Sequence, residues 1–295
     1  MSTEKKTQTL VLFTISFVLT LVATSCAPIQ PTSPTGPRGN EPIYPVLLME
    51  DSARRETAQA ALNRLRQSGG LARNSEISTT ETSLSPITAT ISLPTSASVN
   101  AYLPKVGAGG VMNEEETRES LRRFVRDWRE IIGAEPDRLS LVDHLVQPDG
   151  SSIANYEQRS FRFPIRGNYG KLQIRFASDR RILSLSSSCI PDADKVRSAL
   201  RSLGAGGGLT ARLTAEDAVK KLRENDMPSL DPKIVNLRVP ATAQLIPREL
   251  VTHVQPSKTR SDALEFRIAW EIETNNAPFK LGYVDAITGE LIAVQ

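Results

Sequence analysis

The sequence predicts an α+β protein with two modules, each a helix followed by antiparallel strands. Three observations predict this class. Apolar and polar residues alternate along several segments, most clearly from Leu264 to Ile272, as in strands with one buried face. Helical periodicity precedes each group of strands, at 113–133 and again from Thr214. A glycine-rich linker at 204–213 separates the two groups.

Composition and charge are ordinary for a globular protein of this length. The 295 residues are 39% hydrophobic and 23% charged, and the formal net charge is +3. The first 25 residues hold one acidic and two basic side chains, so without them the net charge is +2. A charge this small gives no reason to expect nucleic acid as a partner.

The pattern of the N-terminus predicts an export signal. Lys5 and Lys6 precede an apolar run at 10–22, and Ala23-Thr24-Ser25-Cys26 follows. The small residues before Cys26 resemble the lipobox of bacterial lipoproteins. That resemblance implies a signal peptide at 1–25, diacylation of Cys26, and a lipid anchor in the bacterial cell envelope. A secreted or periplasmic product of an ordinary signal, or a transmembrane anchor, stays an alternative.

The next part of the chain is expected to connect this anchor to the folded body. Residues 26–45 are rich in Pro, Ser and Thr and predict a flexible tether. Residues 46–105 predict one helix at 51–67, ended by Gly69-Gly70, and then a loosely ordered segment with a short β-prone piece at 87–93. The predicted apolar stripe of the helix is Ala58, Ala61, Leu62 and Leu65.

The first module is expected at 106–203 and begins with a helix over 113–133. Asn113 and Glu116 form the pattern of a capping box, and Gly133 is the expected stop. Its apolar stripe is Leu121, Phe124, Val125, Trp128, Ile131 and Ile132. The opposite face carries four arginines. We interpret these as a solvated face with acidic neighbours rather than as an anion-binding patch.

The strands of this module are expected to form a meander that is exposed to solvent on one face and covered by the helix on the other. A short strand is predicted at 139–142, and further strands around 161–165, 172–176 and 183–185. The turns fall at 167–170 and 178–180. A short helix at 194–203 is expected to end the module.

The second module, 214–295, repeats the plan. Thr214 and Asp217 begin its helix. Strands are predicted at 243–246, 250–254, 264–272, 279–283 and 291–294. A tight turn at 285–289 joins the last two, with Asp285 capping it and Gly289 free to take a positive φ.

The chain lacks the residue patterns of catalysis. His144 and His253 are its only histidines, and Cys189 has no partner if Cys26 carries lipid. No His-Glu-x-x-His zinc motif, phosphate-binding loop or EF-hand ladder is present. We interpret two pairs of acids as solvated loop residues, Asp143 with Asp149 and Asp192 with Asp194. We therefore predict no catalytic residue, no cofactor and no metal site, and we interpret Trp128 and Trp270 as core residues.

Short motifs in both modules resemble peptidase propeptides. Residues 155–190, with Tyr156-Glu157-Gln158, Pro164-Ile165-Arg166-Gly167 and Gly170-Lys171-Leu172-Gln173-Ile174, are similar to the FTP module of fungalysin-like and thermolysin-like metallopeptidases. Residues 214–295 resemble a PepSY domain, above all in the Val284-Asp285-Ala286-Ile287-Thr288-Gly289-Glu290 hairpin. The resemblance covers roughly residues 113–295 and implies a propeptide-like or cystatin-like fold.

In that family the pair precedes a catalytic domain, assists its folding and inhibits it. The present chain ends at Gln295 directly after the PepSY-like hairpin. The resemblance therefore implies a non-catalytic envelope lipoprotein that binds and regulates a peptidase or another envelope protein, by inhibition or by folding assistance. The alternative is a structural or accessory lipoprotein with no role in proteolysis.

Overall fold

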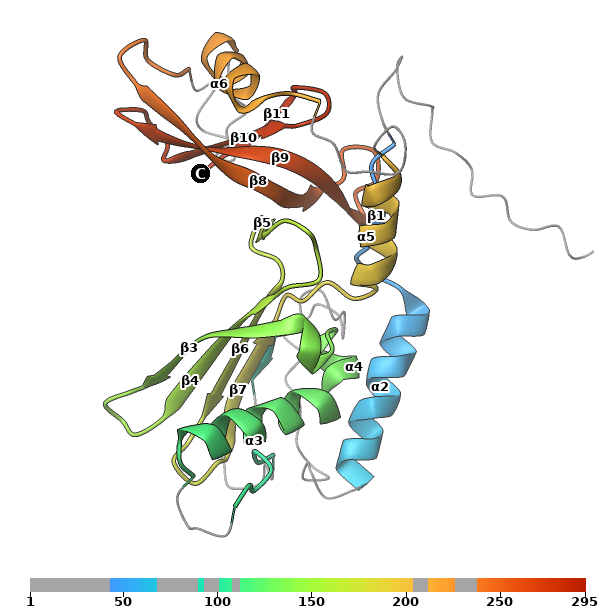
Figure 1. Ribbon diagram of the computed structural model, residues 1–295. Coiled ribbons are helices and arrows are strands. Elements are labelled where there is room, and N and C mark those ends of the chain that lie inside the picture. Colours follow the sequence, from blue (N-terminus) through green and yellow to red (C-terminus); the bar gives the residue numbers. More distant parts are fainter. Residues whose placement is uncertain (1–42, 68–89, 93–100, 108–111, 204–211, 226–237) are drawn as a thin grey trace, which may run out of the picture. The chain divides into compact units, whose positions relative to one another are not determined.

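The computed structural model describes residues 43–67, 90–92, 101–107, 112–203, 212–225 and 238–295. Within them the chain has the predicted α+β fold, with two sheets whose strands pair almost entirely antiparallel (Figure 1). The predicted signal peptide, Cys26, Gly69-Gly70 and most of the tether and of the 204–213 linker lie outside the described residues.

The first sheet has five strands, and consecutive neighbours in it are all antiparallel. Its order is β2 (Thr90–Ser92), β7 (Ile182–Ser187), β6 (Lys171–Phe176), β4 (Ser152–Gln158) and β3 (Leu139–Val146). The predicted alternation in β6 is confirmed, because Leu172, Ile174 and Phe176 are buried while the residues between them are more exposed. β2 lies inside the β-prone piece predicted at 87–93.

The strand predicted around 161–165 is wrong. The second strand of the meander is β4, and of the predicted segment only Ile165 is in a strand, the two-residue β5 (Ile165–Arg166) of the other sheet. Phe161 and Phe163 pack in the core of that second sheet. Alternating apolar residues report burial on one face of an extended segment, but they do not say against which sheet the face is buried.

β5 runs parallel to β8 (Gln244–Pro256), with Ile165 opposite Thr252. Gly167 makes this approach possible, because its φ is +95° and a Cβ there would lie 2.1 Å from the Val254 carbonyl oxygen. Only glycine fits such a close approach in this conformation. The turn that the sequence places in the middle of the meander therefore docks on the second sheet.

Helices cover the buried face of the first sheet. α3 (Glu114–Asp127) begins with the predicted capping box, in which the Asn113 side chain and the Glu116 side chain each accept a backbone N–H of the other residue. The predicted single helix is interrupted at Trp128 and continues as α4 (Arg129–Ile132), which Gly133 ends at φ +83°. The shared core contains these buried residues: Leu121, Phe124, Val125, Trp128, Ile131, Ile132, Ala154, Tyr156, Leu172, Ile174, Phe176, Ile182 and Leu185.

The N-terminal region contributes to both sheets. α2 (Ser52–Gln67) is the predicted helix, and its Ala61 and Leu62 belong to the core of the first sheet. β1 (Val46–Leu48), which the sequence did not predict, pairs antiparallel with β9 of the second sheet. A short 3₁₀ turn, η1 (Pro136–Arg138), leads into β3.

The second sheet has the order β11 (Leu291–Val294), β10 (Leu281–Asp285), β9 (Ala263–Asn275), β8 and β5, with β1 beside part of β9. β9 is the strongest predicted strand, and its Leu264, Phe266, Ile268 and Ile272 are buried as expected. The expectation of a single buried face is wrong, because the residues between them, Glu265, Arg267, Ala269 and Glu271, are buried as well. The two strands predicted at 243–246 and 250–254 are one strand, β8, with a register shift between Pro247 and Leu250. Proline cannot donate to the ladder, so a bulge is the form in which a strand accommodates it.

Two short helices pack on the second sheet. α6 (Ala215–Glu224) starts at the predicted Thr214 capping box and buries Ala218 and Leu222. α5 (Ala193–Ser202) is the helix predicted to end the first module, yet its Val196 and Leu200 belong to a core cluster with Phe266 of β9. Residues assigned to the first module thus complete the core of the second sheet.

Both tryptophans are core residues, as predicted. Trp128 is 4% exposed and stacks on Phe124, with 4.9 Å between the ring centroids. Trp270 packs against both core clusters under α5 and α6, and its indole Nε1 donates to the Leu213 carbonyl oxygen at 3.0 Å.

Candidate functional site

The two histidines lie on different sheets and pack against aromatic rings. His144 of β3 stacks on Phe176, and His253 of β8 lies 4.7 Å from Tyr283, centroid to centroid. His253 is 5% exposed, and burial together with the Arg267 charge lowers its pKa to about 4. His253 is therefore a packing residue of the second sheet.

Cys189 is fully buried and unpaired at the end of β7. Burial raises the pKa of its thiol to about 12, so the reactive thiolate is scarce near neutral pH. The neighbouring Ser187 donates its hydroxyl to the Ile132 carbonyl oxygen at 2.6 Å and so ties β7 to α4. These side chains serve packing and hydrogen bonding.

The acid pairs singled out in the sequence are engaged with neighbouring donors. Asp143 accepts from the Asn155 side chain at 2.7 Å, and Asp149 accepts from the Ser151 N–H at 2.9 Å and from Arg175 at 2.7 Å. Asp192 pairs with Lys195 at 2.9 Å, and Asp194 pairs with Arg197 at 2.7 Å. Across the residues that the structure describes, no group of three or more His, Cys, Asp or Glu side chains could hold a metal ion.

The arginines of the first long helix are paired as predicted. Arg122 and Arg123 both donate to Glu119 at 2.7 Å, and these bonds hold the pKa of the Glu119 carboxyl at about 2. Arg126 pairs with Asp127, and Arg129 lies 3.2 Å from Glu135. These are exposed surface pairs with acidic neighbours, in which Arg122 and Arg123 share the single Glu119 carboxylate.

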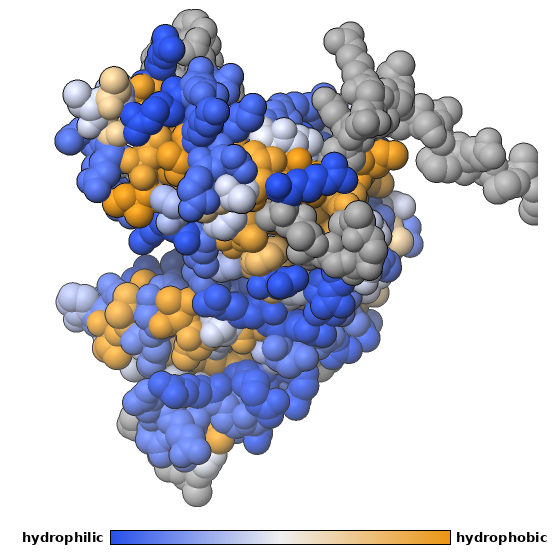
Figure 2. Space-filling model, turned by 45° about the horizontal axis from the view of Figure 1, so that its top comes forward, coloured by the Kyte–Doolittle hydropathy of each residue, from blue (hydrophilic) through white to orange (hydrophobic). Residues whose placement is uncertain are grey.

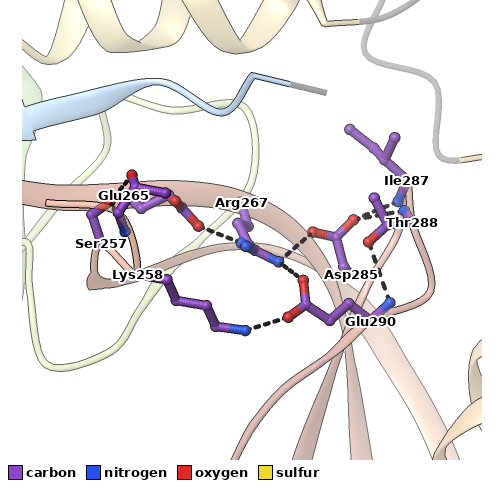
Figure 3. Close-up of polar contacts among 9 residues, drawn as sticks. Ser257, Lys258, Glu265, Arg267, Asp285, Ile287, Thr288 and Glu290 are labelled. Atoms are coloured by element: carbon purple, nitrogen blue, oxygen red, sulfur yellow. Dashed lines mark hydrogen bonds and ion pairs between the residues drawn. The ribbon is translucent and has the colours of Figure 1, made fainter. Parts of the chain in front are cut away.

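The hairpin between β10 and β11 is organised by Asp285, which is 0% exposed. Its carboxylate accepts the backbone N–H groups of Ile287 and Thr288 at 2.8 and 2.9 Å, as the predicted turn requires. Figure 3 shows the Arg267 side chain directed at three carboxylates, those of Glu265, Asp285 and Glu290.

Arg267 makes this cluster a buried network. It is 6% exposed and donates to Glu265 at 2.6 Å, while Lys258 pairs with the outer oxygen of Glu290. Tyr44 lies over the guanidinium, with 4.5 Å between Arg267 Cζ and the ring centroid. Buried carboxylates are costly without a cation, so the network fixes the hairpin to β9 and to the N-terminal segment.

A second polar group ties β5 to the second sheet. The Arg166 Nε donates to the nearly buried Glu271 at 2.6 Å, and its Nη2 lies 3.1 Å from Glu249. The Tyr283 hydroxyl donates to Glu271 at 3.3 Å, and burial raises the Tyr283 pKa to about 12. A charged contact therefore holds β5 to the rest of the second sheet in addition to its pairing with β8.

One part of the described surface has no pairing partner within the fold, namely the outer edge of β3. This strand is last in the sheet order, and on its far side no strand pairs with it within the described ranges. Three of its apolar side chains are exposed: Val142 at 54%, Leu145 at 49% and Val146 at 72%. Figure 2 shows that apolar surface on the visible face gathers in patches within a largely hydrophilic surface. Exposed apolar residues on an unpaired edge are typical of an interaction site.

A groove of about 690 Å³ lies between this edge and α3. Its apolar lining comes from Met112, Val125, Pro136, Leu139, Leu141, Val142 and Tyr156. Its polar lining is Asn113, Glu114, Thr117, Arg118, Arg122, Asp143 and His144. We call this feature the α3–β3 groove. Its volume falls within the range of pockets that bind a small molecule or a few side chains of a partner.

His144 lines this groove, and its Nε2 makes no hydrogen bond to the described residues. That atom is buried, and no partner for it is found in the part of the chain that the structure describes. A buried polar atom without a partner costs free energy, which an incoming donor or acceptor would recover. His144 is thus part of the candidate site.

Sequence reasoning found the start of this strand but not its importance. The predicted strand at 139–142 continues to Val146, and its bulge between Leu141 and Asp143 was not foreseen. The signal was the apolar Leu145-Val146 pair directly before a turn. The order of strands decides which one is an edge, and that order is set by tertiary pairing.

Comparison with known proteins returns no match: neither a family model nor a curated protein is similar to this chain. The resemblance to FTP and PepSY modules therefore rests on the short motifs alone. No helix within the described ranges has the length and apolar character needed to cross a membrane.

Proposed function

We propose that this protein is a non-catalytic, lipid-anchored envelope protein that binds another protein and regulates it. The partner is a peptidase or another envelope protein, which the chain inhibits or assists in folding. Export and anchoring follow from the N-terminal signal and Cys26. The regulatory role follows from the resemblance of the motifs at 155–190 and 214–295 to peptidase propeptides.

The observation that carries the proposal is the unpaired apolar edge of β3 with the α3–β3 groove beside it. His253, Cys189 and the singled-out acids are packed or paired in ways that serve the fold. The α3–β3 groove and the apolar edge beside it are left open. A surface of this kind suits binding of a protein better than chemistry on a small substrate.

The test uses the full chain purified in detergent. It is titrated against secreted metallopeptidases, both as active enzymes and during refolding, and against candidate partners captured from envelope extract and then purified. We expect direct binding to one of them at micromolar affinity or better, with a change in its activity or in its refolding yield. Direct binding to none of them would refute the proposal.

A genetic arm separates the two functions that the sequence left open. Deletion of the gene should alter the activity or the amount of the bound peptidase or envelope partner. An altered envelope with unchanged proteolysis and no affected partner would instead favour the structural or accessory role. Mass spectrometry of the mature N-terminus tests lipidation, since a diacylated Cys26 is expected as the first residue.

A further inference from the structure

The backbone of β3 presents an ordered set of unused hydrogen-bonding groups. Two contacts fix which residues these are. The Gln158 N–H donates to the Gly170 carbonyl oxygen, so Gln158 faces β6, and by alternation Ala154 and Ser152 also face β6. Their partners across the ladder are His144 and Val146. The N–H and C=O groups of these two residues consequently point away from β4, toward the open edge.

The closing contact of the hairpin gives the same result independently. The Gln147 N–H donates to the Ser151 carbonyl oxygen at 2.7 Å, toward β4. Successive residues of a strand direct their backbone groups to opposite sides, so Leu145 faces β4 and Val146 and His144 face outward. An added strand, antiparallel or parallel, pairs with the outward backbone groups of every second residue, and His144 and Val146 have this spacing.

The side chains around this edge suit an apolar segment. His144 and Val146 lie on the α3 side of the strand, beside the α3–β3 groove, while Leu145 lies on the opposite, polar face. A strand laid along the edge would cover Val146 and Leu145 from the side. Its alternate side chains would enter the groove, where His144 Nε2 lacks a partner.

The charges around the groove are balanced. Its charged lining consists of two acids, Glu114 and Asp143, and two arginines, Arg118 and Arg122, and Arg118 donates to Glu114 at 2.6 Å. The groove therefore has no excess charge for a charged occupant to neutralise, and burying an unpaired charge there would be costly. An uncharged segment fits best, with apolar groups for the lining and a polar group for His144.

A second copy of this chain fits the edge less well. The bulge between Leu141 and Asp143 and the turn that starts at Gln147 would confine a symmetric β3–β3 pair to the few residues around Leu145. A segment of another protein can instead continue past the bulge along the groove as far as Leu139. The groove lining at Pro136 and Leu139 lies beyond the reach of the short symmetric pair.

We propose that the β3 edge binds an extended, uncharged segment of a partner protein as an added strand, with an apolar side chain in the α3–β3 groove. This proposal rests on the proposed function and names how the partner is held. The backbone groups of His144 and Val146 supply the affinity, and the groove supplies the selectivity.

The probe is a random peptide library of about twelve residues, displayed on phage and selected on the purified full chain. Selected peptides should carry apolar residues at every second position and few charges. Val146→Pro removes one outward N–H and places a ring at the edge, while the β3–β4 ladder stays intact. It should weaken binding by about tenfold. Val146→Thr keeps the N–H and the β-branched shape, so its binding should change by less than about threefold.

Hydrogen exchange on the unmodified chain gives a readout that does not depend on a variant. With a selected peptide at saturation, the amides of His144 and Val146 should exchange at least about tenfold more slowly. Peptides without alternation, peptides that Val146→Pro binds as well as the original, or unchanged exchange at His144 and Val146 would each overturn the proposal. So would a dimer of the full chain that Val146→Pro dissociates, because the occupant would then be a second copy.

The outcomes separate this proposal from the function on which it rests. If a peptidase or envelope partner binds the original chain and Val146→Pro equally well, the regulatory function stands and the edge proposal fails. If peptides bind the edge as described but no envelope protein or peptidase binds the chain, the edge proposal stands and the regulatory function fails.

Discussion

Substitution of Gly167 by alanine tests whether the β5 turn really docks on the second sheet. Gly167 has a φ of +95°, and an added Cβ would lie 2.1 Å from the Val254 carbonyl oxygen, whereas real Cβ atoms stay beyond 3.0 Å. Gly150, in the turn after β3, is the matched control. Its φ is +78°, yet a Cβ there would meet nothing within 4 Å.

The expected magnitudes follow from these two environments. Alanine at positive φ costs about 1–2 kcal/mol, and the reduced freedom of the unfolded chain returns about 0.4–1 kcal/mol. Gly150→Ala should therefore lower the free energy of unfolding by about 1 kcal/mol. In Gly167→Ala the backbone must also move away from β8, which breaks the short β5–β8 pairing and strains the Arg166–Glu271 contact. Weakening one partner of a nearly buried ion pair raises the expected loss to about 3–4 kcal/mol.

The assay is urea unfolding of the three proteins, followed by far-ultraviolet circular dichroism and by tryptophan fluorescence. Trp128 reports on the first sheet and Trp270 on the second. Gly167→Ala should be the less stable variant by about 2 kcal/mol or more. Equal losses in the two variants, within about 0.5 kcal/mol, would refute the inferred contact between β5 and β8.

Three further predictions concern buried groups. Arg267→Met should cost about 3–5 kcal/mol of unfolding free energy because it leaves buried carboxylates without their cation. Arg260→Met, at an exposed pair, should leave the unfolding free energy nearly unchanged, and similar losses in the two variants would contradict the buried network. His253 has a pKa of about 4 when folded and about 6.5 when unfolded, so the unfolded state binds the extra proton between these values. Stability should fall by about 3 kcal/mol as the pH drops through this window, and His253→Gln, measured by urea unfolding at several pH values, should lose that part of the dependence. In a Cys26→Ser chain, Cys189 should resist a thiol reagent at pH 8 until urea is added; rapid native labelling would show that it is accessible.

Local sequence signals predicted most of the elements correctly. Asn113 and Thr214 are the caps that their patterns indicate, and Gly133 ends its helix at positive φ. These signals are local because a cap satisfies backbone groups within a few residues of itself. The alternation in β9 predicted the strand correctly, although both of its faces are buried and the polar residues of one face are held in ion pairs.

The errors have two causes, tertiary neighbours that the sequence does not name and a pattern too short to recognise. Phe161 and Phe163 have a strand-like pattern, but they are buried by the second sheet rather than by the meander. β1 was missed because three residues carry too little pattern to predict a strand. Arg267 was missed as an organising residue because a cation inside a predicted strand reads as a polar outer face until its three carboxylate partners are placed around it.

The sequence by itself determined the α+β class, the helix boundaries and the turn at Asp285, because caps, periodicity and turn chemistry act over a few residues. Only the tertiary structure decided that β3 lies at an edge, that His144 and Val146 turn their backbone groups outward, and that Gly167 meets β8. Each of these depends on which segments distant in the chain become neighbours. Strand order and register are set by the sum of many such contacts, which no single stretch of sequence contains.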